Sequence, residues 1–155
     1  MERRSSDGVG DLGKWLVETG ERLELRPGKR AVTQCRIDHA FTIIFGDADE
    51  TFEIRIDEPF TLGTAGGDDV SLDPEGPSAA IAPALDVLHR GVESAVAFKD
   101  GRLEIGFDDG RVLRVPAGET YEAWTLVGPA GLYIVSVPGG ELAIWEPKRE
   151  DPARS

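Results

Sequence analysis

Apolar and polar residues alternate in two parts of the chain, a pattern typical of half-buried β-strands. In the first part, runs at residues 32–37, 40–45 and 52–57 are joined by a tight turn at Asp38-His39 and by an acidic loop. In the second part, runs at 92–98, 103–107 and 112–115 are separated by turns that contain Asp-Gly. Asp-Gly between alternating runs is a strong hairpin signal because such turns need a positive φ. We therefore predict two antiparallel three-strand meanders.

The two meanders resemble each other at an offset of 62 residues. The segment from Asp38 to Phe45 corresponds to the segment from Asp100 to Phe107: each begins with an aspartate, continues with three alternating apolar residues and leads into an acidic turn. The match is consistent with a duplicated three-strand unit. It is also what any two unrelated meanders would show, so both explanations stay open here.

The remaining chain completes a mostly β prediction. Runs at 120–127, 132–137 and 142–145 predict further strands between glycine- and proline-containing turns, and residues 15–30 favour extended structure. Pro83 fits the first turn of a short helix over residues 83–89, with Leu85 and Leu88 facing inward and Gly91 ending it. The expected architecture is one antiparallel β domain over residues 15–146, either a partly open barrel or a sandwich.

Three segments read as poorly structured. Residues 1–14 are polar and glycine-rich and predict a disordered tail, and residues 147–155 read as a C-terminal tail. Residues 63–78 contain glycine, aspartate and proline throughout, which predicts a long, mobile acidic loop.

The first residues hold no apolar run of the kind that a secretory signal needs, and no apolar run in the sequence approaches the length of a membrane span. With a single cysteine, no disulfide can form within the chain. These features favour a cytoplasmic protein.

The chain is strongly acidic, and its charged residues are unevenly distributed along the sequence. The 155 residues carry a net charge of −12, and residues 45–76 hold ten acidic residues against the single base Arg55. A field of this sign repels nucleic acid and anionic lipid and attracts basic proteins. Acidic surface also keeps proteins soluble, and that explanation needs no partner. We therefore expect a basic protein partner if there is one, with no nucleic acid and no membrane. Nothing in the sequence fixes the oligomeric state.

Several segments together resemble a known family. In order along the chain they are Val32-Thr33-Gln34, Glu58-Pro59-Phe60-Thr61-Leu62, Tyr121-Glu122-Ala123-Trp124 and Pro138-Gly139-Gly140-Glu141-Leu142-Ala143-Ile144-Trp145. Over about residues 28–146 the chain is similar to a bacterial, mainly actinobacterial, family of small proteins of unknown function. The resemblance implies a small β-rich domain and no assigned activity or cofactor. Residues 1–27 and the length of the 63–78 segment stand outside the family pattern.

The segment Tyr121-Glu122-Ala123-Trp124 is the first candidate binding site. On a strand, Glu122 and Trp124 would share one face, and a carboxylate beside an indole can hold a cationic ligand group. The alternative is structural, with Trp124 in the core and Glu122 paired with Arg102, Arg111 or Arg114. A second candidate is the acidic surface of the first meander, whose binding residues would be Asp47, Asp49, Glu50, Glu53 and Glu58.

The remaining chemistry is sparse. Asp38-His39 suits an acid–base pair, but a turn in which the aspartate bonds its own backbone is commoner. Cys35 lies in a strand pattern, where a free cysteine is usually a small apolar residue, and His89 would end the short helix. Asp47 to Glu58 has calcium-loop spacing, but Phe52 stands where that loop needs glycine. The signatures of nucleotide binding, serine hydrolases and zinc proteases are absent from the sequence, and we predict no catalytic residue, cofactor or metal.

Three functions follow as hypotheses. The first is a non-enzymatic module that binds a basic protein, in the manner of an immunity protein that blocks a basic toxin. The second is a β domain that encloses a small molecule between Tyr121, Glu122, Trp124, Tyr133 and Trp145. The third is an enzyme of unknown type that uses Asp38, His39 or Glu122.

Overall fold

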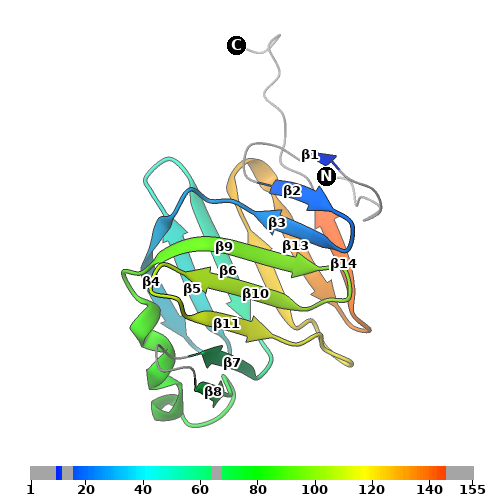
Figure 1. Ribbon diagram of the computed structural model, residues 1–155. Helices are drawn as coiled ribbons and strands as arrows, with labels where there is room; N and C mark the ends of the chain where they lie inside the picture. Colours follow the sequence, from blue (N-terminus) through cyan, green and yellow to red (C-terminus); the bar gives the residue numbers. More distant parts are fainter. Residues whose placement is uncertain (1–9, 12–15, 64–67, 146–155) are drawn as a thin grey trace.

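The computed structural model describes residues 10–11, 16–63 and 68–145. Within these residues, fourteen strands form one sheet in which every pairing is antiparallel. The sheet is open at its ends and bends into two layers that face each other (Figure 1). The mostly β prediction is confirmed, and of the two architectures it left open the sandwich describes the molecule.

Each layer is built from strands of both halves of the chain. One layer has the order β14 (Glu141–Trp145), β13 (Tyr133–Val137), β12 (Trp124–Val127), β6 (Thr51–Ile56), β5 (Phe41–Gly46) and β4 (Arg30–Ile37). The other continues through β9 (Gly91–Phe98), β10 (Leu103–Phe107), β11 (Val112–Val115), β7 (Phe60–Gly63) and β8 (Asp69–Leu72). Strand β3 (Arg22–Leu25) pairs with the second half of β9, on the same side as β4, and is followed outward by β2 (Leu16–Thr19) and β1 (Gly10–Asp11).

Strand β4 joins the two layers. Its first two residues, Arg30 and Ala31, pair with Val92 and Gly91 of β9, and the residues from Val32 onward pair with β5. A bulge between Val32 and Gln34 separates the two pairings. Because a bulge increases the local bend of a strand, it allows β4 to leave one layer and enter the other.

The strand order is symmetric about the β4–β9 pair. The order β13-β12-β6-β5-β4 on one side matches β8-β7-β11-β10-β9 on the other, once each strand is replaced by its counterpart about 62 residues away. Arg30 pairs with Val92, the residue 62 positions later, so this pair lies at the centre of the symmetry between the two halves. Both halves also exchange their last hairpin: β7–β8 joins β11, and β12–β13 joins β6. The arrangement extends the similarity seen in the sequence from three strands to five.

Large apolar side chains fill the space between the layers. Phe41 of β5 stacks on Phe60 of β7 with ring centroids 5.6 Å apart, a contact that crosses from one layer to the other. Phe45 and Phe52 stack at 5.3 Å within one layer. In β6 the buried residues Phe52, Ile54 and Ile56 alternate with outward-facing ones, as the period-two pattern predicts.

The short helix differs from the prediction. It is a 3₁₀ helix, η1 (Ser78–Val87), that contains Pro83 in its interior. Leu85 and Leu88, predicted to face inward, are exposed. The buried residues are Ile81, Ala84 and Val87. Their spacing of three puts them on one face of a 3₁₀ helix, and Leu85 and Leu88, which are also three apart, lie on a neighbouring face.

The structure confirms some of the predictions for the other segments and contradicts others. Residues 16–25 form the predicted extended structure as the β2–β3 hairpin. The segment 63–78 is not one continuous loop, because it contains β8. The chain leaves the helix through His89, which takes the positive φ of 71° that was expected at Gly91. Most of the predicted tails, residues 1–14 and 147–155, lie outside the described residues. Within the described part of the chain, no helix has the length and apolar character needed to cross a membrane.

Candidate functional site

A cleft of about 820 Å³ opens at one end of the sandwich. The loops after β6, β8 and β13 and the loop before β12 meet there, so the cleft draws on both layers. Its lining consists of His39, Arg55, Asp57, Glu58, Pro59, Asp73, Glu75, Thr120, Tyr121, Glu122, Thr125 and Pro138.

The lining is strongly acidic. It contains five carboxylates: those of Asp57, Glu58, Asp73, Glu75 and Glu122. Among the residues that line it, Arg55 is the only arginine or lysine, and its guanidinium lies 3.3 Å from Asp57 and 3.5 Å from Asp38. Net negative charge in a concave surface focuses the field on whatever enters it. The cleft therefore favours cationic groups.

Tyr121 and Glu122 project at the edge of this cleft because the residues after them are fixed. The N–H of Asp57 donates to the carbonyl of Ala123 at 2.9 Å, and the N–H of Ala123 donates to the carbonyl of Ser136 at 3.1 Å. Ala123 is fully buried, whereas the Tyr121 side chain is 73% exposed. The prediction that all of residues 121–124 lie on a strand is wrong, since β12 begins at Trp124.

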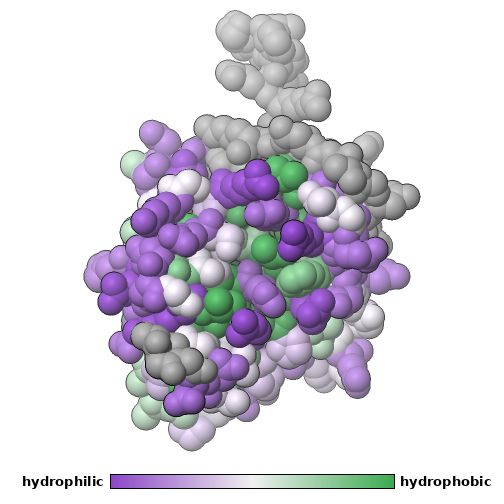
Figure 2. All heavy atoms as spheres, viewed as in Figure 1, coloured by the Kyte–Doolittle hydropathy of each residue, from purple (hydrophilic) through white to green (hydrophobic). Residues whose placement is uncertain are grey.

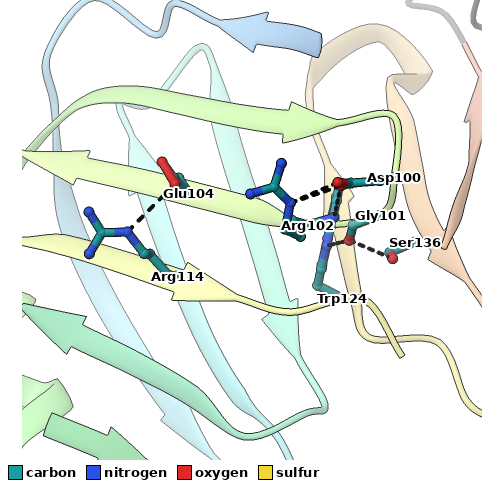
Figure 3. A network of polar contacts seen from close by, with 7 residues as sticks. All are labelled: Asp100, Gly101, Arg102, Glu104, Arg114, Trp124 and Ser136. Carbon is teal, nitrogen blue, oxygen red and sulfur yellow. Dashed lines mark hydrogen bonds and ion pairs between the residues drawn. The ribbon is translucent and has the colours of Figure 1, made fainter. Parts of the chain in front are cut away.

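Trp124 belongs to the core. Its indole N–H donates to the carbonyl of Gly101 at 2.8 Å, and the hydroxyl of Ser136 donates to the same oxygen at 2.8 Å (Figure 3). The ring is completely buried, as the structural alternative required. The arginines proposed as partners of Glu122 pair with other carboxylates instead: Arg102 with Asp100, Arg111 with Asp86 and Asp109, and Arg114 with Glu104.

Gly118 allows the loop before β12 to close against the cleft. A Cβ atom at this position would lie 2.4 Å from the carbonyl oxygen of Tyr121 and 3.1 Å from a carboxylate oxygen of Glu58. The first distance is shorter than any real contact, so a side chain here would push Tyr121 away from Glu58. Glycine thus keeps two of the predicted site residues close together.

The other predicted acidic residues lie outside the cleft lining. Asp47 and Glu50 form the β5–β6 turn, where the Asp47 carboxylate accepts the N–H groups of Asp49 and Glu50 at 2.9 and 2.8 Å. Both also pair with Arg30. Glu53 pairs with Arg36 at 3.0 Å. Of the acidic residues predicted as a binding face, the structure brings only Glu58 together with Tyr121 and Glu122.

The cleft also contains acidic residues that sequence reasoning missed. Asp57 was placed in a strand, and Asp73 and Glu75 in a mobile loop. Strand β8 carries them to the cleft by pairing with β7, and the Asp73 carboxylate accepts the N–H of Glu75 at 3.0 Å. The excess of acidic over basic residues in 45–76 pointed to this region of the chain. It could not show that Asp73 lines the cleft and that Asp47 does not.

Asp38 and His39 occupy the predicted turn. The N–H of Ala40 donates to the Asp38 carboxylate at 2.8 Å, and the N–H of Asp38 donates to the carbonyl of Ala40 at 3.1 Å. The first of these bonds, assisted by the nearby Arg55 guanidinium, holds the pKa of Asp38 below its ordinary value. The carboxylate therefore acts as a turn residue, with His39 beside it in the cleft lining.

This pKa shift gives a testable pH dependence. Because the pKa of Asp38 is lowered in the folded state, its contribution to stability is complete above the pKa of the unfolded chain and disappears as pH falls through the folded-state pKa. A carboxyl ¹³C titration by NMR is expected to place the Asp38 pKa below 3.8. In Arg55→Gln the pKa is expected to rise only in part, since the backbone donor remains. A value at or above 3.8 in the native protein would contradict the assignment.

The remaining candidate residues do not come together in one site. Cys35 is half-buried, and burial raises the pKa of its thiol. Phe52 of the calcium-like segment is buried in β6. Tyr133 and Trp145, proposed to enclose a ligand with Trp124, form an edge-to-face pair across β13 and β14 at 5.3 Å. Among the described residues, no three histidine, cysteine or acidic side chains are grouped so as to hold a metal ion.

Residues 23–146 match the model of a family of unknown function (DUF6188). The chain belongs to this family. The match confirms the predicted resemblance to a family without assigned function and runs from β3 to the end of β14. No curated protein and no solved structure shows a significant match.

The DUF6188 region contains the complete acidic cleft and both five-strand halves of the sandwich. Strand β2 lies outside it and adds to the edge formed by β3. One buried contact fixes this addition: the Lys99 ammonium lies 2.8 Å from the Glu18 carboxylate, with side-chain exposures of 11% and 0%. The contact ties β2 to the turn between β9 and β10.

Proposed function

We propose that this protein is a non-enzymatic interaction module whose acidic cleft binds a basic segment of a partner protein. The observation that carries the proposal is the meeting of five carboxylates and the exposed ring of Tyr121 in one concave surface. Arginine and lysine side chains are attracted by such a field and also stack on tyrosine faces. A soluble bacterial protein that blocks a basic toxin in the cytoplasm, as immunity proteins do, is the specific form we propose.

The arrangement also supports fast association. Carboxylates spread over a cleft raise the rate of encounter with a basic surface, and the effect weakens as salt increases. The cleft is wide enough for several side chains, and its carboxylates come from three separate loops. We therefore expect the partner segment to carry more than one arginine or lysine.

Charge reversal within the cleft tests the proposal. Glu75→Lys/Glu122→Lys changes two exposed lining residues. The matched control, Asp86→Lys/Glu93→Lys, makes the same change in net charge at exposed residues outside the lining. With a hexa-arginine peptide as probe, the cleft variant is expected to raise the Kd about tenfold relative to the control, by removing two attractions and adding two repulsions.

Capture from a native lysate extends the test to a protein partner. A basic protein retained at low salt, lost at high salt and lost with the cleft variant but kept by the control would support the proposal. Equal loss of peptide binding in the two variants would show that only net charge matters. Retention of the partner by the cleft variant would also contradict the proposal.

A further inference from the structure

A second hollow lies on the outer face of the other layer. It has a volume of about 350 Å³, and its lining is mostly apolar. The lining residues are Pro59, Phe60, Thr61, Ser71, Arg102, Leu103, Glu104, Arg114, Val115 and Pro116. Figure 2 looks onto this face and shows apolar residues between hydrophilic ones in its middle. We call this feature the outer groove.

The charged residues of the outer groove differ from those of the acidic cleft. Strand register places Thr61, Arg114 and Glu104 side by side across β7, β11 and β10. Figure 3 shows the side chains of Arg102, Glu104 and Arg114 along this part of the sheet. The lining of the outer groove has two arginines and one glutamate, whereas that of the acidic cleft has one arginine and five carboxylates.

The two arginines are engaged to different degrees. Arg102 donates through Nε to both carboxylate oxygens of Asp100, at 2.8 and 3.1 Å, and its guanidinium lies 4.4 Å from the ring centroid of Phe98. Arg114 approaches Glu104 only through Nε, at 3.5 Å, and both side chains are partly exposed. That distance is long for a direct hydrogen bond. Within the part of the chain that the structure describes, the Nη groups of Arg114 have no hydrogen-bond or ion-pair partner.

We propose that the outer groove binds a small organic acid, with its apolar body in the hollow and its carboxylate on the Nη groups of Arg114. A guanidinium binds a carboxylate through two parallel hydrogen bonds, which fixes the orientation of the ligand. The volume and the mostly apolar lining suit a ligand of phenylalkyl size, in a hollow at the small end of ligand sites. Glu104 competes with the ligand for Arg114 and therefore limits its affinity.

Three probes with the same apolar body test the proposal: 4-phenylbutyrate, 4-phenylbutanol and 4-phenylbutylamine. The Kd of each is measured by ¹⁵N NMR titration of the full chain, following the amides of Thr61, Glu104 and Arg114. The butyrate is expected to bind about fivefold more tightly than the alcohol, which corresponds to one exposed ion pair. The amine is expected to shift these amides less than the alcohol does.

Variants assign the effect to Arg114. Arg114→Gln is expected to remove the advantage of the butyrate over the alcohol. Arg36→Gln is the matched control, because Arg36 has the same side-chain exposure of 48%, also pairs with a glutamate, and lies in the other layer. Glu104→Gln is expected to tighten butyrate binding, since it removes the competing carboxylate.

Three results would overturn the proposal. They are equal affinity for butyrate and alcohol in the native protein, an unchanged preference in Arg114→Gln, and tighter binding of the amine at the same amides. The amine would prevail if the overall negative charge decided binding. Amine-induced shifts confined to Tyr121 and Glu122 would report the acidic cleft instead, so the two proposals can fail separately.

Discussion

Replacing Trp124 with alanine is expected to lower the free energy of unfolding by about 4 kcal/mol. The ring is completely buried, and its N–H holds the carbonyl of Gly101 in the turn between β9 and β10. The substitution removes the largest fully buried side chain of the described residues and opens a cavity between the layers. Urea denaturation followed by circular dichroism measures the change. Trp124→Phe is expected to lose only about 1–2 kcal/mol, because most of the volume stays and one hydrogen bond goes.

Trp145 provides the control for this prediction. It lies at the end of β14, an edge strand, and is only partly buried against Tyr133. Trp145→Ala is expected to lose less than half as much stability as Trp124→Ala. If the two alanine variants unfold at the same urea concentration with the same slope, Trp124 is not the anchor between the layers.

The second large effect is expected at Lys99. Replacing it with methionine keeps most of the side-chain volume but removes the cation 2.8 Å from the fully buried Glu18 carboxylate. Removing one partner of a buried ion pair removes the attraction that offsets the desolvation of the other, and we expect this to reduce stability by about 3 kcal/mol. Thermal and urea unfolding measure the loss, and hydrogen exchange of the β2–β3 amides is expected to accelerate most.

Two further variants give this prediction its controls. Lys29→Met removes an exposed lysine that lies 4.0 Å from Glu93, and a change below about 1 kcal/mol is expected there. The double variant Glu18→Gln/Lys99→Met is expected to recover part of the lost stability, since the buried charge is gone. Equal effects of Lys99→Met and Lys29→Met would show that the Glu18–Lys99 contact is not needed to hold β2.

The strands were largely predictable from the sequence because each strand buries one of its two faces in the core. In β6 and β10, apolar residues recur at every second position, and the Asp-Gly turns mark where the chain reverses. The bend of β4 was not predictable, since no side-chain pattern distinguishes Ala31, which pairs with β9, from Cys35, which pairs with β5. The helix was misplaced because Pro83 was assigned to its first turn, whereas the helix begins at Ser78 and holds Pro83 in its interior.

The candidate site was predictable only in part. Tyr121 and Glu122 stood out because an aromatic residue and a carboxylate are adjacent there. Their neighbours in the cleft come from positions as far apart as His39 and Pro138, and only the exchange of hairpins between the halves brings them together. Local patterns carry no information on such an exchange. The outer groove was missed for the same reason, since β7 and β11 pair across the two halves.

The exchanged hairpins have a consequence for biosynthesis. When the ribosome has made the first half of the chain, β7–β8 still has no β11 to pair with, and β6 waits for β12. One layer is finished only when Val115 at the end of β11 has left the exit tunnel, and the other only when Trp145 at the end of β14 has done so. Pairings between such distant segments raise the contact order and slow folding. The nascent first half therefore emerges with unpaired strand edges, which is the state in which a chain depends most on chaperones.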